Sequence, residues 1–177
     1  VVEKNQKLFF FDKTEYKNVD DRLVITLNSG SDFIDGQNSY LSFKVKVTGT
    51  GDTGGTKYIS WGLGSAANLF SEIIIRSRDG SEIERVRDLN SLVLTRCHWT
   101  KSQDYINNKG SESGYFGLGD PTKDGVYSNE ETSLQLRTGQ DYVIPMRDLS
   151  SLFNVQKLLP SFLMSGLRIE LVLAPPT

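Results

Sequence analysis

Apolar and polar residues alternate one by one near the end of this chain, in the segment SGLRIELVLAPPT (165–177). Leu167 and Ile169 fall on one side of an extended strand, whereas Arg168 and Glu170 fall on the other. A period of two places successive side chains on opposite faces of a sheet. The segment is therefore predicted to be a strand that buries one face, and the chain is expected to consist mainly of such strands.

Further segments carry strand signals. They are residues 19–28, 40–47, 73–78, 82–86, 133–137 and 142–145. Asp79 and Gly80 separate two of these segments and are the pair that a two-residue hairpin turn prefers, because both central residues of that turn need a positive φ. About seven or eight short strands, joined by long and uneven connections, predict an antiparallel sandwich and not alternating βαβ units.

Two short helices are predicted between the strands. Asp88 can cap the first, because Leu89 and Val93 follow it with helical spacing. The second is expected over residues 148–159, where apolar residues recur on one helical face, and Pro160 is its predicted stop. Both helices are interpreted as insertions between strands.

Two long connections show no periodicity. The first, residues 48–57, contains four glycines and is expected to be a mobile surface loop. The second, residues 98–131, is longer than the roughly 12 to 15 residues that are usual for structureless loops, and longer loops tend to carry function or an interface. We therefore expect contacts with other molecules in the second connection.

Charge is nearly balanced, with 20 basic and 22 acidic residues and a formal net charge of −2. The two signs are mixed along the chain, which argues against a nucleic-acid surface, since such surfaces form a basic stripe. The charges around the predicted hairpin are interpreted as solvated faces and cross-strand pairs. No apolar run reaches the ~20 residues of a membrane helix, so membrane insertion is not expected.

Few residues could carry catalysis. His98 is the only histidine, whereas a metal site of the cupin kind uses two or more. Cys97 and His98 are neighbours on a predicted helix, point about 100° apart, and are interpreted as structural. Asp120 and Asp124 lack the dense carboxylates of a calcium loop and are interpreted as turn residues. No catalytic, cofactor-binding or metal-binding residue is predicted, and the chain is not expected to be an enzyme.

The aromatic side chains leave a binding function open. Trp61 and Trp99, with Tyr58 and Tyr105, could form a platform on which sugar rings stack. Aromatic residues in a sandwich are more often part of its core, and that interpretation is preferred. A carbohydrate-binding β-sandwich module is kept as the alternative function, ahead of a jelly-roll enzyme.

The sequence resembles, in three stretches, the N-terminal jelly roll of double jelly-roll major capsid proteins of double-stranded DNA viruses, virophages and polinton-like elements. The stretches are FIDGQNSYLSFKVKV (33–47), SAANLFSEIIIRSRDGSEIERVRDLNSL (65–92) and LFNVQKLLPSFLMSGLRIELVLAPP (152–176). They share with that family a small-residue turn before a strand, a hairpin with an Asp-Gly turn, and a last strand followed by a proline-rich link. The resemblance includes no catalytic signature.

The resemblance implies an all-β, antiparallel eight-stranded jelly-roll sandwich with two short inserted helices. Residues 1–21 would form an N-terminal arm or edge segment and residues 22–177 a single domain. Pro175 and Pro176 cannot donate ladder hydrogen bonds and would stiffen the exit toward a further domain or subunit. Such proteins form trimeric or larger blocks that tile an icosahedral shell. The expected partners are therefore copies of the chain and other capsid proteins, and the expected location is the virion.

Overall fold

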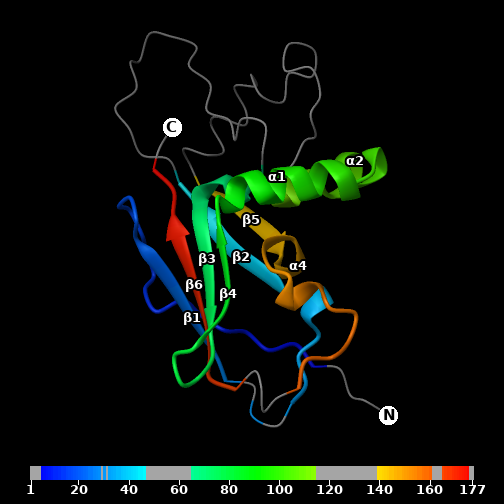
Figure 1. Ribbon diagram of the computed structural model, residues 1–177. Coiled ribbons are helices and arrows are strands. Elements are labelled where there is room, and N and C mark those ends of the chain that lie inside the picture. Colours follow the sequence, from blue (N-terminus) through cyan, green and yellow to red (C-terminus); the bar gives the residue numbers. More distant parts are fainter. Residues whose placement is uncertain are drawn as a thin grey trace.

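The computed structural model of the chain describes residues 5–28, 30, 32–46, 65–114, 139–160 and 165–175 (Figure 1). It is mostly β, with a four-stranded antiparallel sheet in the order β1-β6-β3-β4 and a two-stranded antiparallel sheet. The first sheet contains β1 (Arg22–Leu27), β6 (Leu167–Leu173), β3 (Phe70–Arg76) and β4 (Glu82–Arg87); the second contains β2 (Tyr40–Val45) and β5 (Gln140–Pro145). The arrangement is consistent with a β-sandwich.

The strands pair from the two ends of the chain inward. β1 pairs with β6, β2 with β5 and β3 with β4, and each pair is antiparallel. A further antiparallel ladder joins β6 to β3. The predicted strand near residue 170 is therefore confirmed as β6, and it lies inside the four-stranded sheet with a partner on each side. We call this pattern the nested pairing of the strands.

Alternation along the strands decides which side chains enter the core. Both sheets contribute to it, through Leu23, Ile25, Leu27, Leu41, Phe70, Ile73, Ile75, Tyr142, Ile144, Leu167, Ile169 and Leu171. Phe43 of β2 meets Phe70 of β3 edge to face, with the ring centroids 5.4 Å apart. Because these two strands belong to different sheets, the contact joins the sheets face to face. Removal of this apolar surface from water is the main force that holds them together.

The hairpin between β3 and β4 is confirmed, but its turn is longer than predicted. The Ser77 N–H donates to the Ser81 carbonyl (2.8 Å), and the Gly80 N–H donates to the Ser77 carbonyl (3.0 Å). Within the turn only Gly80 has a positive φ, of 91°, whereas the predicted turn needs two such residues. The loop therefore has three residues, 78–80, the form in which glycine follows a type I turn. The Asp79 carboxylate supports it by accepting the Ser81 N–H (3.1 Å).

Helix α1 (Leu89–Thr100) confirms the first predicted helix and extends it. Its buried residues, Leu89, Val93 and Cys97, recur every fourth position and form one face. The predicted cap is wrong, because Asp88 makes no capping hydrogen bond and has left-handed backbone angles, φ 51° and ψ 46°. A capping side chain normally requires an extended backbone at that position.

Helix α2 (Gln103–Ser113) lies in a segment for which the sequence predicts no regular structure, so that expectation is wrong for residues 98–113. α1 and α2 follow one another across one end of the sheets (Figure 1), where α1 contacts β3 and α2 contacts β5. A polar helix of this kind depends on tertiary packing more than on its own propensity. Residues 48–57 and 115–138, which include the predicted strand 133–137, lie outside the described residues.

The second predicted helix, over residues 148–159, is wrong. α4 spans Met146–Leu149, and a single 3-10 turn, η3, spans Leu152–Asn154. Beyond it the chain pairs like a strand, because Leu159 and Ile34 exchange two backbone hydrogen bonds of 2.8 and 2.9 Å. Bonds to a distant segment thus replace the helix that the local apolar spacing predicts.

Another 3-10 turn, η1 (Gly36–Asn38), packs against η3. A Cβ added at Gly36 would lie 3.0 Å from the carbonyl oxygen of Phe153 and 3.2 Å from its Cα. Glycine is therefore favoured at this position, because a Cβ would fit only if the Phe153 backbone moved by a few tenths of an ångström. The close contact between η1 and η3 positions the start of β2, which follows η1 directly.

Residues 5–21 run beside the outer edge of β1. Phe11 forms an isolated antiparallel bridge with Ile25, and the Asp12 N–H donates to the Val24 carbonyl (3.0 Å). The ring of Tyr16 packs on Phe11, with the centroids 6.0 Å apart. The segment therefore covers part of an edge that would otherwise expose backbone donors and acceptors. Six strands lie in the part of the chain that the structure describes, and the eight-stranded jelly roll stays a prediction.

Candidate functional site

Cys97 and His98 of α1 lie in different environments. Cys97 is buried, and burial, with the nearby charge of Asp148, raises the pKa of its thiol to about 12. The thiol is therefore protonated at neutral pH and is a poor nucleophile. His98 is exposed to solvent. Adjacent positions on a helix thus separate the two groups, as the sequence indicates.

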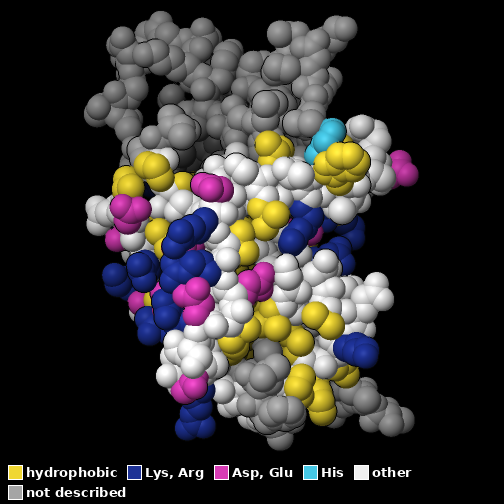
Figure 2. Space-filling model, viewed as in Figure 1, with side chains coloured by type: hydrophobic (Ala, Val, Ile, Leu, Met, Phe, Trp, Pro, Cys, Tyr) yellow, Lys and Arg dark blue, Asp and Glu magenta, His cyan; other side chains and the backbone are white. Residues whose placement is uncertain are grey.

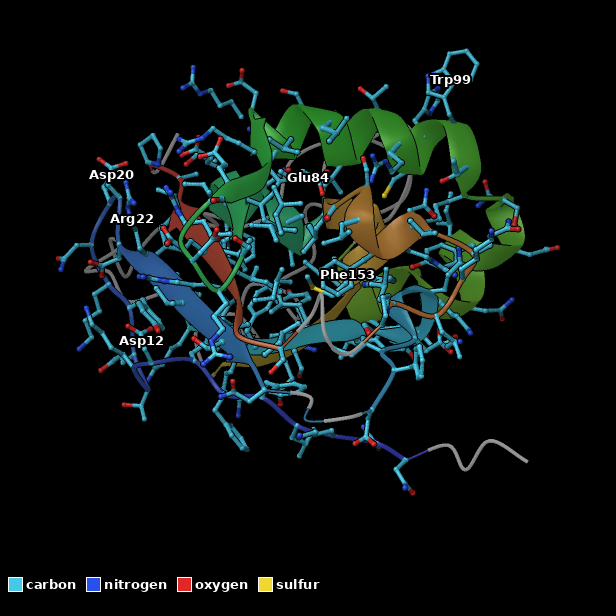
Figure 3. The ribbon with its side chains drawn as sticks, turned by 60° about the horizontal axis from the view of Figure 1, so that its bottom comes forward. Asp12, Asp20, Arg22, Glu84, Trp99 and Phe153 are labelled. Atoms are coloured by element: carbon cyan, nitrogen blue, oxygen red, sulfur yellow. The ribbon has the colours of Figure 1, made fainter. Side chains whose placement is uncertain are left out.

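Trp99 projects from α1 into solvent and is 81% exposed (Figure 3). Tyr105 of α2 is half-buried, and the Lys101 ammonium lies 4.5 Å from its ring centroid. Trp61 and Tyr58, the other members of the predicted platform, lie outside the described residues. The interpretation of the tryptophans as core residues is therefore wrong for Trp99, which offers a flat aromatic surface to solvent.

A buried ion pair joins α1 to α4. Lys101 Nζ lies 2.8 Å from Asp148 Oδ2, and the two side chains are 8% and 9% exposed. Lys101 directly follows α1, and Arg96 within that helix donates to the backbone carbonyls of Arg147 and Asp148, at 3.0 and 3.1 Å. Opposite charges that leave water together compensate one another, so this contact positions the helix without presenting charge at the surface.

Glu84 of β4 organises the chain between α4 and η3 (Figure 3). Its carboxylate accepts hydrogen bonds from the Ser150 hydroxyl (2.6 Å), the Ser151 N–H (2.8 Å) and the Leu152 N–H (3.1 Å). Partial burial raises the pKa of Glu84, but these three donors outweigh it, so that the pKa lies below its ordinary value. The two N–H groups are thereby engaged, which explains why α4 does not continue into the predicted helix.

Arginines and glutamates form a network on the outward face of the four-stranded sheet. Glu170 of β6 is its centre: one carboxylate oxygen lies 3.3 Å from Arg22, and the other lies 3.2 Å from Arg168 and 3.5 Å from Arg76. Figure 2 shows basic side chains gathered over this sheet. We call this surface the arginine face and define it by five residues: Arg22, Arg76, Arg85, Arg87 and Arg168.

The two arginines of β4 extend the network. Arg85 lies 3.0 Å from Glu72 and 2.7 Å from Glu82, and Arg87 lies 3.6 Å from Glu72. The hydrogen bond with Glu82 is the main reason that the pKa of Arg85 is raised above its usual range. The prediction of cross-strand pairs around the hairpin is therefore confirmed for the Glu72 contacts, since β3 and β4 are neighbours.

Sequence reasoning missed that the hairpin charges belong to a larger surface. Arg22 of β1 and Arg168 of β6 join them through Glu170, although these residues lie far from the hairpin in sequence. A signal was present, because all three occupy the polar positions of strands whose alternate residues are apolar. These polar positions predict a shared surface only when the order of the strands in the sheet is known.

Apolar side chains are exposed beside η1 and η3. Phe33, Val155 and Leu158 are 62%, 41% and 50% exposed, and the hydrogen bonds between Ile34 and Leu159 hold their segments together. The surface also has a hollow of about 370 Å³, lined by Asp35, Gln37, Asn38, Val155, Gln156, Lys157 and Leu158. We call Phe33, Val155 and Leu158 the apolar end. Apolar groups rimmed by polar ones are typical of interaction surfaces.

Neither a cluster of metal ligands nor a membrane-spanning helix occurs in the part of the chain that the structure describes. The described residues contain no group of three or more His, Cys, Asp or Glu side chains placed to hold a metal ion, and Asp120 and Asp124 lie outside them. Nor is any described helix both long and apolar enough to cross a membrane. Comparison of the chain with family models, with curated proteins and with solved structures finds no match in any of the three.

Proposed function

We propose that the chain is a structural subunit of a viral capsid, and that its copies assemble into an icosahedral shell through contacts between jelly-roll sandwiches. The observation that carries this proposal is the nested pairing of the strands. When a long antiparallel hairpin is wound into two sheets, its first strand pairs with its last and its second with its last but one. The pairs β1·β6, β2·β5 and β3·β4 follow this rule, and jelly rolls are double-sheet structures of this kind.

The capsid-like stretches of the sequence coincide with these elements. Residues 33–47 contain η1 and β2, residues 65–92 contain β3, β4 and the start of α1, and residues 152–176 contain η3 and β6. The short 3-10 helix η2 (Ala66–Leu69) precedes β3, where the resemblance implies a small-residue turn and a short helix. Resemblance and strand pairing therefore support the proposal at the same places in the chain.

The apolar end offers a surface for contact between copies. Its three apolar side chains are surrounded by polar residues of the hollow, and a net charge of only −2 allows copies to approach one another. A specific contact of this kind would bury roughly 1,200 to 2,000 Å² in total. We therefore place one subunit contact at the apolar end.

The native mass of the purified protein, measured by light scattering, tests the proposal. Against a subunit of 19.8 kDa, we expect a trimer, a pentamer or a larger closed species. The double variant Phe33→Asp/Leu158→Asp should lower that mass, whereas the control Val19→Asp, at an apolar residue that is also exposed, should not. A wild-type protein that stays monomeric when concentrated would contradict the proposal.

A carbohydrate-binding module is the second candidate, and the exposure of Trp99 favours it. Indole rings present a flat apolar face with a polar N–H, which suits stacking on a sugar ring. On a glycan array we expect a signal that Trp99→Ala abolishes and that Phe10→Ala, a matched change at another exposed aromatic residue, leaves intact. A blank array with folded protein would exclude this candidate.

A further inference from the structure

Charges on the arginine face are separated by depth. The side chains of Glu170 and Glu72 are 5% and 18% exposed, whereas those of Arg22, Arg168 and Arg87 are 58%, 51% and 77% exposed. Glu170 and Glu72 therefore lie in the floor of the surface, with the guanidiniums of Arg22, Arg168 and Arg87 above them. Glu82, which is 37% exposed, lies at a depth similar to that of Arg76 and Arg85, which are 29% and 30% exposed. A molecule that approaches the β1 and β6 side of the sheet meets positive charges first.

Positive charge also exceeds negative charge on this face. Its five arginines are accompanied by three glutamates, Glu72, Glu82 and Glu170, which leaves an excess of two positive charges. The chain as a whole has a net charge of −2. The arginine face is therefore a local reversal of the sign of the molecule, and it would attract negatively charged groups.

The carboxylate beneath holds the guanidiniums in place. Arg22 contacts Glu170 through Nη1 and Arg168 contacts it through Nε. A guanidinium has five N–H donors, and these two make no other ion pair with the residues that the structure describes. Their remaining donors are available to a partner, and because Glu170 already orders them, binding costs less conformational entropy.

We propose that the arginine face binds an acidic segment of another protein through the carboxylates of that segment. Guanidinium forks match carboxylate groups in bidentate geometry, which lysine cannot do. Five of the nine arginines of the chain lie in the strands of this sheet, and none of its eleven lysines does. Enrichment in arginine with depletion of lysine is the composition of protein–protein interfaces.

Nucleic acid fits this surface less well. A phosphate backbone presents a continuous line of negative charge and is usually met by a stripe of both lysine and arginine. Here Glu72 and Glu82 lie among the arginines, so a continuous line of phosphates would meet negative as well as positive side chains. Separate carboxylates on a polypeptide can avoid these glutamates.

The inference needs only the arginine face and is independent of the proposed capsid function.

Titration of the full chain with a fluorescent poly-L-glutamate of about 20 residues, followed by anisotropy, tests the inference. We expect saturable binding that weakens as salt is added. The double variant Arg22→Gln/Arg168→Gln should weaken binding about tenfold. The control Lys17→Gln/Lys44→Gln removes the same charge at exposed residues outside this sheet, and its affinity should stay within about twofold of wild type.

A single variant keeps the inference testable if the double variant does not fold. Arg87→Gln removes the most exposed guanidinium while Arg85 continues to pair with Glu72, and it should weaken poly-glutamate binding about threefold. Circular dichroism and an unchanged melting temperature confirm that each variant is folded. Absence of poly-glutamate binding by wild type overturns the inference, as does an equal loss in the lysine control. Tighter binding of an oligothymidylate at the same salt would assign the face to nucleic acid and overturn it too.

Discussion

Two carboxylates are buried in the described part of this protein, and they are compensated in different ways. Asp148 meets a single lysine, Lys101, which is as buried as the carboxylate itself. Glu170 meets three arginines, two of which are more than half exposed. In the first region the charges cancel inside the protein. In the second, positive charge exceeds negative charge and reaches the surface.

A buried carboxylate can therefore serve the structure alone, as Asp148 does, or hold cations at the surface, as Glu170 does. The Lys101–Asp148 pair cannot regain water if it is broken, so each partner requires the other and the contact serves the structure. The guanidiniums around Glu170 keep part of their hydration, because the long arginine side chain covers apolar surface while its head reaches solvent. Their remaining donors can therefore contact another partner while Glu170 still holds them.

The largest expected effect is at the buried pair. Asp148→Ala leaves the Lys101 ammonium buried without a partner and should lower the free energy of unfolding by about 3 to 5 kcal/mol. Urea unfolding of the two proteins measures the change. The double variant Lys101→Met/Asp148→Ala removes both charges and should recover part of the loss. A cost below about 1 kcal/mol for the single variant would mean that the lysine reaches water when the pair is broken.

A smaller loss is expected at Glu170. Glu170→Gln preserves the shape of the side chain but leaves three neighbouring guanidiniums to repel one another, which should cost about 1 to 3 kcal/mol of unfolding free energy. Because two of the arginines are largely exposed, salt should recover much of this loss. Thermal unfolding at low and high salt measures it. Asp148→Asn is the matched control, and its loss should be insensitive to salt; equal salt dependence would remove the distinction between the two regions.

Glu84 sharpens the comparison, because its carboxylate is compensated by N–H and O–H donors and not by a cation. Glu84→Gln should cost about 1 to 2 kcal/mol of unfolding free energy at neutral pH. The pKa of Glu84 is lowered in the folded protein, so its contribution is present above the ordinary pKa of glutamate and is lost as the pH falls through the folded value.

Urea unfolding at several pH values between neutral and about 3 checks the prediction for Glu84. Wild type should lose more stability than Glu84→Gln over this range, so that the two proteins converge in acid. Other carboxyl groups with lowered pKa, such as Asp79 and Asp21, act equally in both proteins and cancel in the difference. A difference that stays constant with pH would show that charge at Glu84 is unimportant.

The smallest effect is expected at the start of α1, the helix that ends beside Lys101. Asp88 has a φ of 51° and makes no capping hydrogen bond, so Asp88→Gly should stabilise the protein by about 0.5 to 1 kcal/mol, because glycine adopts this conformation without strain. Thermal unfolding measures the gain. The control Asp35→Ala removes a side chain that does cap, by accepting the Asn38 N–H, and it should destabilise the protein by about 1 kcal/mol.

Local patterns predicted some elements of this fold well. The alternation of Leu23, Ile25 and Leu27 identified β1, because side chains two apart share a face whatever the rest of the chain does. The helix expected over residues 148–159 failed for the opposite reason. Glu84 binds donors at the start of that segment and Ile34 pairs with its end, and both come from distant parts of the sequence.

The candidate surfaces were less predictable than the strands. Sequence reasoning identified the hairpin charges and interpreted them as cross-strand pairs, and it identified Trp99 but expected it in the core. Exposure depends on what packs against a residue, and nothing in the residues next to Trp99 contains that information. The same applies to Phe33 and Leu158, whose segments meet through backbone bonds between Ile34 and Leu159.

By itself the sequence determined where the six described strands lie, which side of each is apolar, and that the chain has a single histidine and a single cysteine. Only the tertiary structure decided that arginines from β1, β3 and β6 meet at Glu170. The physical reason is that alternation is a property of neighbouring residues. The order β1-β6-β3-β4 depends instead on how distant strands bury their apolar faces together.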